Sequence, residues 1–256
     1  MLRLAEQVYL RLLKRRQQKF GATPPTKIEG CRVVSVGNLT VGGTGKTPTV
    51  QWLAREMQNR GARVAVVARG YRGRKSDEGA VVSDGQNLLL NARDAGDEPL
   101  LHTRALPGVA VVIGRDRVKA AQRAANECGA NSVVLDDAFG YYSLARDFDL
   151  VLMDARRPFD NGHLLPRGRL REPASALGRA DAVLLTRCNM ASAAQREDAQ
   201  TEIARWTKAP VFQSSHAPVS LRDEATGETQ LLDVLQGAKI GALSALADNA
   251  AFAQTL

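Results

Sequence analysis

A glycine-rich turn, VSVGNLTVGGTGKTPTV, restricts the fold more than any other stretch of this chain. It runs from Val34 to Val50, and the apolar, β-branched residues before the glycines predict a strand. Apolar residues at helical spacing from Val50 to Met57 predict a helix directly after it. A strand, such a turn and a helix, in this order, form the setting in which backbone N–H groups and a helix N-terminus bind phosphate.

The turn follows the pattern G-x-x-x-x-G-K-[ST], with Thr40 in the place of the first glycine. Lys46 is placed to reach the β- and γ-phosphates of a nucleotide, and the Thr47 hydroxyl is placed to bind Mg²⁺. The alternative is a glycine-rich strand-to-helix turn with a surface lysine. The residues predicted to bind the nucleotide are Thr40, Val41, Gly42, Gly43, Thr44, Gly45, Lys46 and Thr47.

Further apolar runs follow, and because they are near-continuous rather than alternating, both of their faces should be buried in a parallel sheet. Helices are predicted between them at residues 115–128, 172–179 and 192–206. The pattern predicts an α/β fold like that of phosphate-loop (P-loop) NTPases, with a doubly wound, mostly parallel sheet and ligands at the carboxyl ends of the strands. The predicted strands are 31–38, 62–69, 108–115, 132–137, 149–155 and 181–187.

The chain is expected to divide into three parts. Residues 1–22 form a basic amphipathic helix, residues 23–218 the phosphate-loop core, and residues 219–256 the beginning of a small C-terminal domain with a hairpin turn at 225–230.

The N-terminal helix should carry one apolar stripe, because apolar residues recur at three- and four-residue steps. The stripe consists of Leu2, Ala5, Val8, Tyr9, Leu12 and Leu13. The basic side chains around it are Arg3, Arg11, Lys14, Arg15, Arg16 and Lys19. A basic amphipathic helix can lie in the interface of an anionic membrane, and this is the role predicted for residues 1–22. The alternative is a helix packed on its own domain with a solvated basic rim.

Two adjacent acids, Asp136 and Asp137, end one of the apolar runs. A phosphate loop needs a carboxylate at the end of a neighbouring strand to hold Mg²⁺, which prefers oxygen ligands. The alternative is a solvated turn in which an aspartate caps a helix. Asp154 ends the next strand and is a second candidate of the same kind.

Three polar stretches, residues 69–79, 94–101 and 159–173, are predicted to be loops at strand ends. Each alone could be an ordinary solvated loop. Together they would surround a phosphate site with arginine and carboxylate groups, which suits phosphoryl transfer to a hydroxyl.

Composition favours anionic partners, because the net charge is +8 and most of the 35 basic residues are arginine. An aromatic content of 5% offers few platforms for stacking on nucleic acid bases. The three cysteines, Cys31, Cys128 and Cys188, are too widely spaced to indicate a disulfide framework or a zinc site. With no secretory signal or long apolar run in the sequence, a cytoplasmic location is expected.

The sequence resembles the tetraacyldisaccharide 4′-kinases, the lipid A kinases, from about residue 30 to its end. The motifs that carry the resemblance are VGNLTVGGTGKTP, ARGYRG, GDEP, LDDAF, NGHLLPRGRLREP and HAPVSLRD. The resemblance implies transfer of the γ-phosphoryl group of ATP, with Mg²⁺, to the 4′-hydroxyl of a tetraacyl disaccharide 1-phosphate in lipid A biosynthesis. It also implies a peripheral enzyme on the cytosolic leaflet of the inner membrane, anchored by its N-terminal helix.

The resemblance also implies roles for individual residues. Gly43, Gly45, Lys46 and Thr47 would bind ATP, and Asp136 and Asp137 would organise Mg²⁺. Asp97, in GDEP, matches the position of the base that activates the sugar hydroxyl. The residues expected to position the lipid substrate are Arg69, Arg117, Asn161, Arg171 and Glu172.

Two departures from the family pattern bear on catalysis. Gly140 and Tyr141 stand where the family usually has Gln and His. The chain also ends before a family segment whose histidine supports the catalytic aspartate, so either it is shortened and transfers phosphate slowly, or another group replaces that histidine. The rival hypothesis is a nucleotide-dependent, membrane-associated switch ATPase, which has no evident need for residues 161–173.

Overall fold

A computed structural model describes residues 1–244 and 249–254. Within these residues, eight strands form the central sheet, in the order β3-β4-β2-β5-β1-β6-β7-β8. Every neighbouring pair is parallel except β3 and β4. The strands are β1 (Arg32–Asn38), β2 (Val64–Ala68), β3 (Ala80–Ser83), β4 (Ala110–Ile113), β5 (Ser132–Asp136), β6 (Phe148–Asp154), β7 (Ala182–Thr186) and β8 (Val211–Gln213).

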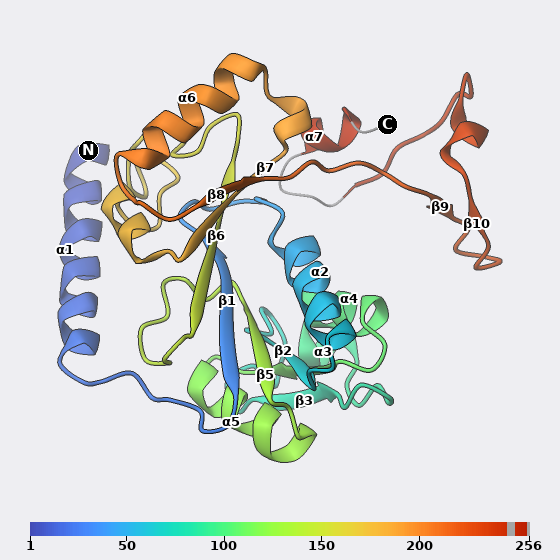
Figure 1. Ribbon diagram of the computed structural model, residues 1–256, viewed down its shortest axis with the longest axis horizontal. Helices are drawn as coiled ribbons and strands as arrows, with labels where there is room; N and C mark the ends of the chain where they lie inside the picture. Colours follow the sequence, from blue (N-terminus) through green and yellow to red (C-terminus); the bar gives the residue numbers. More distant parts are fainter. Residues whose placement is uncertain (245–248, 255–256) are drawn as a thin grey trace.

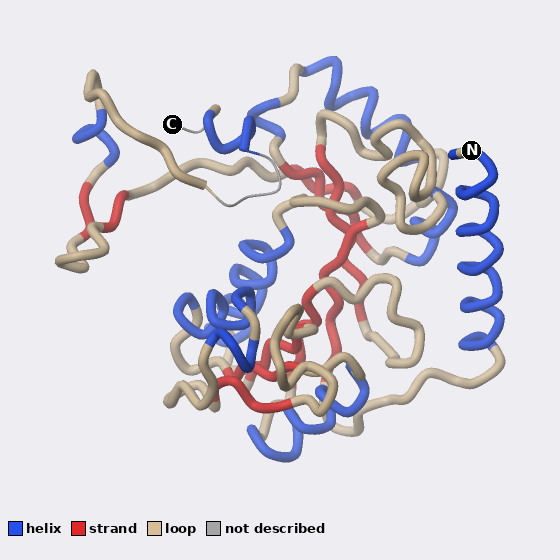
Figure 2. Tube along the Cα trace, turned by 180° about the vertical axis from the view of Figure 1, so that it is seen from behind, coloured by secondary structure: helices blue, strands red, loops and turns tan. Residues whose placement is uncertain are grey.

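Helices cover both faces of this sheet, which confirms the predicted doubly wound α/β fold (Figure 1). One face is covered by α2, α3 and α4, and the other by α5, α6 and α1 (Figures 1 and 2). The helices are α1 (Leu2–Gly21), α2 (Lys46–Asn59), α3 (Ala92–Ala95), α4 (Asp97–Ala105), α5 (Arg117–Cys128), α6 (Ala193–Ala204) and α7 (Asn249–Ala253), with 3₁₀ turns η1 (Ala174–Arg179), η2 (Cys188–Met190) and η3 (Leu232–Leu235).

The inner strands of the sheet are mostly apolar because they contribute to a core on both of their faces. In β6, Val151 and Met153 belong to the cluster that α1 and α6 complete, whereas Leu150 and Leu152 belong to the cluster under α2. Every residue of β2, β4 and β5 is buried.

The stretch 94–101, predicted to be a loop, is instead the end of α3 and the first half of α4. Asn91 caps α3 by accepting a hydrogen bond from the backbone N–H of Asp94, and Gly96, at φ +86°, separates the two helices. Glycine, aspartate and proline suggested a loop, but acidic residues and proline also suit the first turn of a helix. The prediction of a helix at 172–179 is also wrong in type and length, because the structure has a 3₁₀ turn there that covers only residues 174–179.

Helix α1 has two apolar faces rather than the single stripe predicted. Tyr9 and Leu13 point inward and pack against the core formed with β6, β7 and α6. Leu4, Val8 and Leu12 recur every four residues on the outer face and are 68%, 48% and 56% exposed. Among the described residues, no helix has the length and apolar character needed to cross a bilayer.

Beyond β8 the chain leaves the body and forms a small antiparallel hairpin, β9 (Leu221–Arg222) and β10 (Thr229–Gln230), on the side away from α1 (Figure 1). The predicted turn at 225–230 lies at the tip and second strand of this hairpin. A separate domain over 219–256 stays a prediction, and its residues 245–248 and 255–256 lie outside the described residues.

Candidate active site

The glycine-rich loop leaves β1 at the centre of the sheet, between β5 and β6. Both neighbours run parallel to β1, so their carboxyl ends meet at the same edge, and Val36 pairs with Asp136 in the register of β1 and β5. From β1 the chain passes to strands on one side and later returns to fill the other side. Ligands of doubly wound folds bind at such a switch point.

The loop itself is shaped as a cradle for an anion. Gly45 adopts φ +85° directly before α2, and Gly42 adopts φ +113°. The Thr186 hydroxyl donates to the Thr44 carbonyl at 3.1 Å, whereas the buried Thr44 hydroxyl has no hydrogen-bond partner within the described part of the chain. A pocket of about 500 Å³ adjoins the loop; its lining residues are Thr40, Val41, Gly42, Gly43, Thr44, Asp154, Arg156, Arg157, Asp160, Arg169, Arg187 and Gln195. The backbone N–H groups of the loop and the arginine side chains of this pocket fit a phosphate chain.

Lys46 begins α2 and extends back over the end of β1. Its Nζ lies 3.2 Å from Asn38 Oδ1 and 3.9 Å from Asp137 Oδ1. Desolvation lowers the pKa of Lys46, although the charge of Asp137 opposes this effect. Thr47, the next residue, is half-buried in the first turn of the helix.

Asp137 lies between Lys46 of the phosphate loop and the guanidinium of Arg171, which comes from the 159–173 loop. Arg171 donates to both carboxylate oxygens of Asp137, at 2.8 and 2.7 Å, and to the Asn38 carbonyl at 3.2 Å. Burial alone would raise the pKa of Asp137, but the hydrogen bonds and charge of Arg171, together with the charge of Lys46, lower it. Asp137 also adopts φ +54°, and strained backbone of this kind is concentrated at functional sites.

Asp136 is held differently, by a histidine that the sequence analysis did not single out. His102, on α4, is fully buried, and its Nε2 lies 3.0 Å from Asp136 Oδ2. No local signal in the sequence marked His102, because its partner Asp136 lies 34 residues away, at the end of β5. In the described ranges, no three His, Cys, Asp or Glu side chains cluster as a complete metal site. A Mg²⁺ ion would therefore also need phosphate oxygens, as is usual for this ion.

A second pocket, of about 830 Å³, opens beside these two acids and combines carboxylates with arginines. Burial, and then the charge of Asp136, raises the pKa of Glu98, which lies in the first turn of α4 beside Asp97. Three lining residues come from α1. The lining residues are Tyr9, Leu13, Arg16, Asn38, Arg69, Tyr71, Arg72, Asp97, Glu98, Arg115, Arg117, Asp136, Asp137, Gly140, Tyr141, Tyr142, Arg171 and Glu172.

Tyr141, one of the two departures from the family pattern, supports Arg117. Its hydroxyl donates to Asp116 Oδ1 and accepts from the Arg117 backbone N–H, both at 3.2 Å. Arg117 is 5% exposed, and burial and then Arg69 lower its pKa. A side chain at Gly140, the other departure, would place its Cβ 2.8 Å from Glu172 Oε1. This chain therefore uses the two positions for packing around the pocket.

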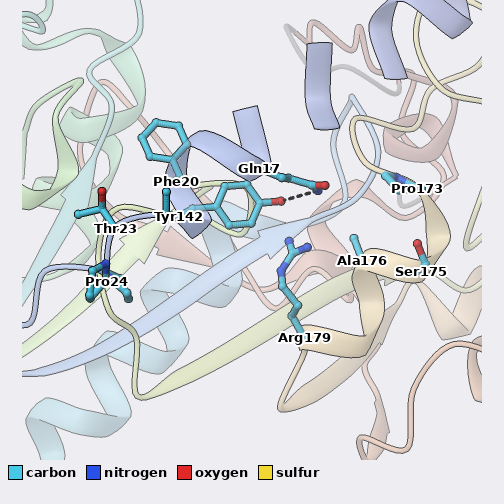
Figure 3. Close-up of a pocket in the computed structure, with 11 residues that line it drawn as sticks. Gln17, Phe20, Thr23, Pro24, Tyr142, Pro173, Ser175, Ala176 and Arg179 are labelled. Carbon is cyan, nitrogen blue, oxygen red and sulfur yellow. Dashed lines mark hydrogen bonds between the residues drawn. The ribbon is translucent and has the colours of Figure 1, made fainter. Parts of the chain in front are cut away.

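Glu172 connects the wall of the second pocket to α1 through the Tyr142 hydroxyl. It is 6% exposed and accepts hydrogen bonds from the Tyr142 hydroxyl and from Arg179 Nη2, the latter at 2.9 Å. Gln17 of α1 donates to the same Tyr142 hydroxyl at 3.1 Å, as the dashed line in Figure 3 shows. Tyr9 of α1 donates to the Arg171 carbonyl at 3.0 Å. Helix α1 is thus part of the wall that holds these side chains.

Two predicted residues are not brought into this arrangement. Asn161 lines neither pocket, because its amide binds its own loop, donating to the Arg167 carbonyl and accepting from the His163 N–H. Asp154, the second metal candidate, lines the first pocket but is paired with Arg156 and Arg187, at 2.7 and 2.6 Å. Their hydrogen bonds outweigh burial and lower its pKa.

Fold and loop together define a phosphate-loop α/β protein of the nucleotide-binding class, with a second pocket of about 830 Å³ beside the loop. The family model described as LpxK, tetraacyldisaccharide-1-P 4′-kinase, matches residues 1–256. The chain belongs to this family, as its motifs led us to expect.

Individual relatives agree with this assignment. The tetraacyldisaccharide 4′-kinase of Anaeromyxobacter dehalogenans (strain 2CP-C) is 48% identical over 234 residues, which are 91% of this chain and 61% of that protein. The enzyme of the same name from Halothermothrix orenii is 36% identical over 268 residues, covering all of this chain and 69% of that protein. A crystal structure of LpxK from Aquifex aeolicus in complex with ATP superposes with a TM-score of 0.77 at 31% identity, over 97% of this chain and 74% of that one. The chain thus spans about three fifths of the length of the first of these relatives.

Proposed function

We propose that this chain binds ATP with Mg²⁺ and transfers the γ-phosphoryl group to the 4′-hydroxyl of a tetraacyl disaccharide 1-phosphate in lipid A biosynthesis. One observation carries the proposal: Asp137 contacts both Lys46 of the phosphate loop and Arg171 of the second pocket. The phosphate loop and the second pocket are therefore directly adjacent. The names of the relatives and the ATP in the Aquifex aeolicus LpxK structure support it.

In this proposal the chain contributes position and charge rather than covalent chemistry. Backbone N–H groups of residues 42–47 and the Lys46 ammonium hold the β- and γ-phosphates. Bound Mg²⁺ supplies neutralisation of the phosphate charge, and Thr47, Asp136 and Asp137 would hold it. Arginine groups in the second pocket would bind the substrate phosphate and saccharide.

Asp97 is the proposed base. It is exposed in the first turn of α4 and lines the same pocket as the two metal-binding candidates. A carboxylate in that position can accept the proton of the attacking 4′-hydroxyl as the bond to phosphorus forms.

A thin-layer assay with γ-³²P-ATP and a tetraacyl disaccharide 1-phosphate tests the reaction. Labelled lipid is expected, with its amount depending on Mg²⁺. ATP hydrolysis without labelled lipid would instead support the switch ATPase, which leaves the second pocket unexplained.

The phosphate-loop part of the proposal predicts a loss of ATP affinity in Gly45→Ala. Its Cβ would lie 2.8 Å from His216 Cε1, at a φ of +85° that L-residues rarely adopt. We expect a decrease of at least about 10-fold in affinity, measured by titration with a fluorescent ATP analogue. Gly61→Ala is the matched control, since Gly61 has the same φ of +85° but open space around it. Equal ATP affinities in the two variants would contradict this role for Gly45.

We also propose that α1 holds the protein on the anionic cytosolic leaflet of the inner membrane. The exposed residues Leu4, Val8 and Leu12 form an apolar outer stripe among basic side chains. This arrangement suits a helix lying in the membrane interface, with the substrate pocket beside it.

Replacing Leu4, Val8 and Leu12 together by glutamine should therefore weaken binding to phosphatidylglycerol vesicles by at least about 10-fold, measured by co-sedimentation. The double change Leu88→Gln and Leu89→Gln removes comparable exposed apolar side chains, 62% and 53% exposed, away from α1. It should leave vesicle binding unchanged. Binding that survives the triple change would exclude α1 as the anchor.

A further inference from the structure

The structure contains a buried histidine that the proposed chemistry does not use. His102 has no exposed surface, and its Nε2 lies 3.0 Å from Oδ2 of Asp136, which is 5% exposed. Its other ring nitrogen, Nδ1, has no hydrogen-bond partner among the residues that the structure describes. Asp136 lines the second pocket, whereas His102 lies behind it and does not.

We propose that His102 is a positioning residue for the metal-binding carboxylate, an inference that rests on the proposed function. Its Nε2–H holds one oxygen of Asp136, so the carboxylate plane is fixed and Oδ1 remains for the metal. Carboxylates that bind metals are generally oriented by such outer hydrogen bonds, and losing one costs about 10- to 100-fold in metal affinity.

The position of His102 in α4 gives this contact a second consequence. The same helix begins at Asp97, five residues earlier, and an α-helix rises about 1.5 Å per residue. The proposed base and the histidine therefore lie about 7.5 Å apart along one rigid element. Pro99 is buried within the first turn and helps to fix where the helix starts. The His102–Asp136 contact thus sets the proposed base and the metal carboxylate relative to each other.

Two substitutions separate this role from simple packing. His102→Leu fills a similar volume with an apolar side chain and removes the donor to Asp136. His102→Gln keeps an N–H near the place of Nε2. Thr103→Val, in the same helix, removes only a hydroxyl that donates to the Leu100 carbonyl, and serves as the control.

The measurement is the affinity for a fluorescent ATP analogue, first in EDTA and then as Mn²⁺ or Mg²⁺ is added. In His102→Leu the metal concentration at half-saturation should increase about 10- to 100-fold, while the affinity in EDTA stays within about 3-fold of that of the unaltered protein. His102→Gln and Thr103→Val should remain within about 3-fold in both measurements. Circular dichroism confirms that each variant is folded, and His102→Met replaces His102→Leu if the latter does not fold.

An unaltered metal dependence in a folded His102→Leu variant would overturn the inference while leaving the proposed function intact. The same increase in His102→Gln and in His102→Leu would also overturn it, because packing alone would then explain the effect. If the unaltered protein shows no metal-dependent nucleotide binding, both the inference and the proposed function fail.

Discussion

Lys46→Ala is expected to decrease the rate of phosphoryl transfer to the lipid by at least about 10²- to 10³-fold. The Lys46 side chain is 16% exposed, and its ammonium lies between Asn38 and Asp137, so water cannot readily take its place. Its charge would be aligned with the phosphates before the reaction starts, where a fixed donor acts most strongly. Single-turnover transfer from γ-³²P-ATP measures this rate directly.

Lys119→Ala is the matched control for Lys46→Ala. Lys119 is exposed on α5 and lines neither pocket, so its removal should leave the transfer rate within about 2-fold. Because Asp137 keeps its two hydrogen bonds to Arg171, Lys46→Ala should also remain folded. A Lys46→Ala variant that transfers label at the unaltered rate would refute the role of the loop.

Asp97→Asn is expected to lose about 10²- to 10⁴-fold in kcat while its affinity for ATP remains unchanged. The substitution keeps the size and polarity of the side chain but removes its ability to accept a proton. The measurements are kcat and KM for the lipid, together with the Kd for the fluorescent ATP analogue.

Glu98→Gln provides the comparison within the same helical turn. Burial and the charge of Asp136 raise the pKa of Glu98, so this carboxyl takes up a proton more readily than an ordinary glutamate. The Gln variant imitates its protonated form and should therefore change kcat by less than about 10-fold. A large loss in Glu98→Gln with none in Asp97→Asn would assign the base to Glu98. Loss of metal-dependent ATP binding in Asp97→Asn would instead indicate a metal-binding role.

Several parts of the site could be predicted because their chemistry is local in the chain. The glycines, Lys46 and Thr47 are consecutive, and the strand and helix on either side follow from apolar spacing alone. Asp136 and Asp137 could be placed at a strand end for the same reason. The distance of these two acids from Lys46 could not be predicted, because it depends on the pairing of β5 with β1. Roughly 95 residues separate these two strands in the sequence.

Other features came only from the fold. Helix α4 was not predicted, because its first residues have the composition of a turn. The burial of His102 against Asp136 was therefore not predicted either. The fork from Arg171 to Asp137 and the support that Tyr141 gives Arg117 join residues that are 34 and 24 apart. Which apolar residues of α1 face outward depends on which of them pack on the core.

By itself, the sequence determined that a phosphate loop follows a buried strand, that two carboxylates end another strand, and that the sheet is doubly wound. These properties follow from backbone conformation and from hydrophobic spacing over a few residues, which neighbours in the chain control. The tertiary structure alone decided which acid contacts Lys46, which is held by a histidine, and which side of α1 faces outward. Those outcomes depend on strand order and helix packing, which bring together groups whose separation along the chain carries no signal of their contact.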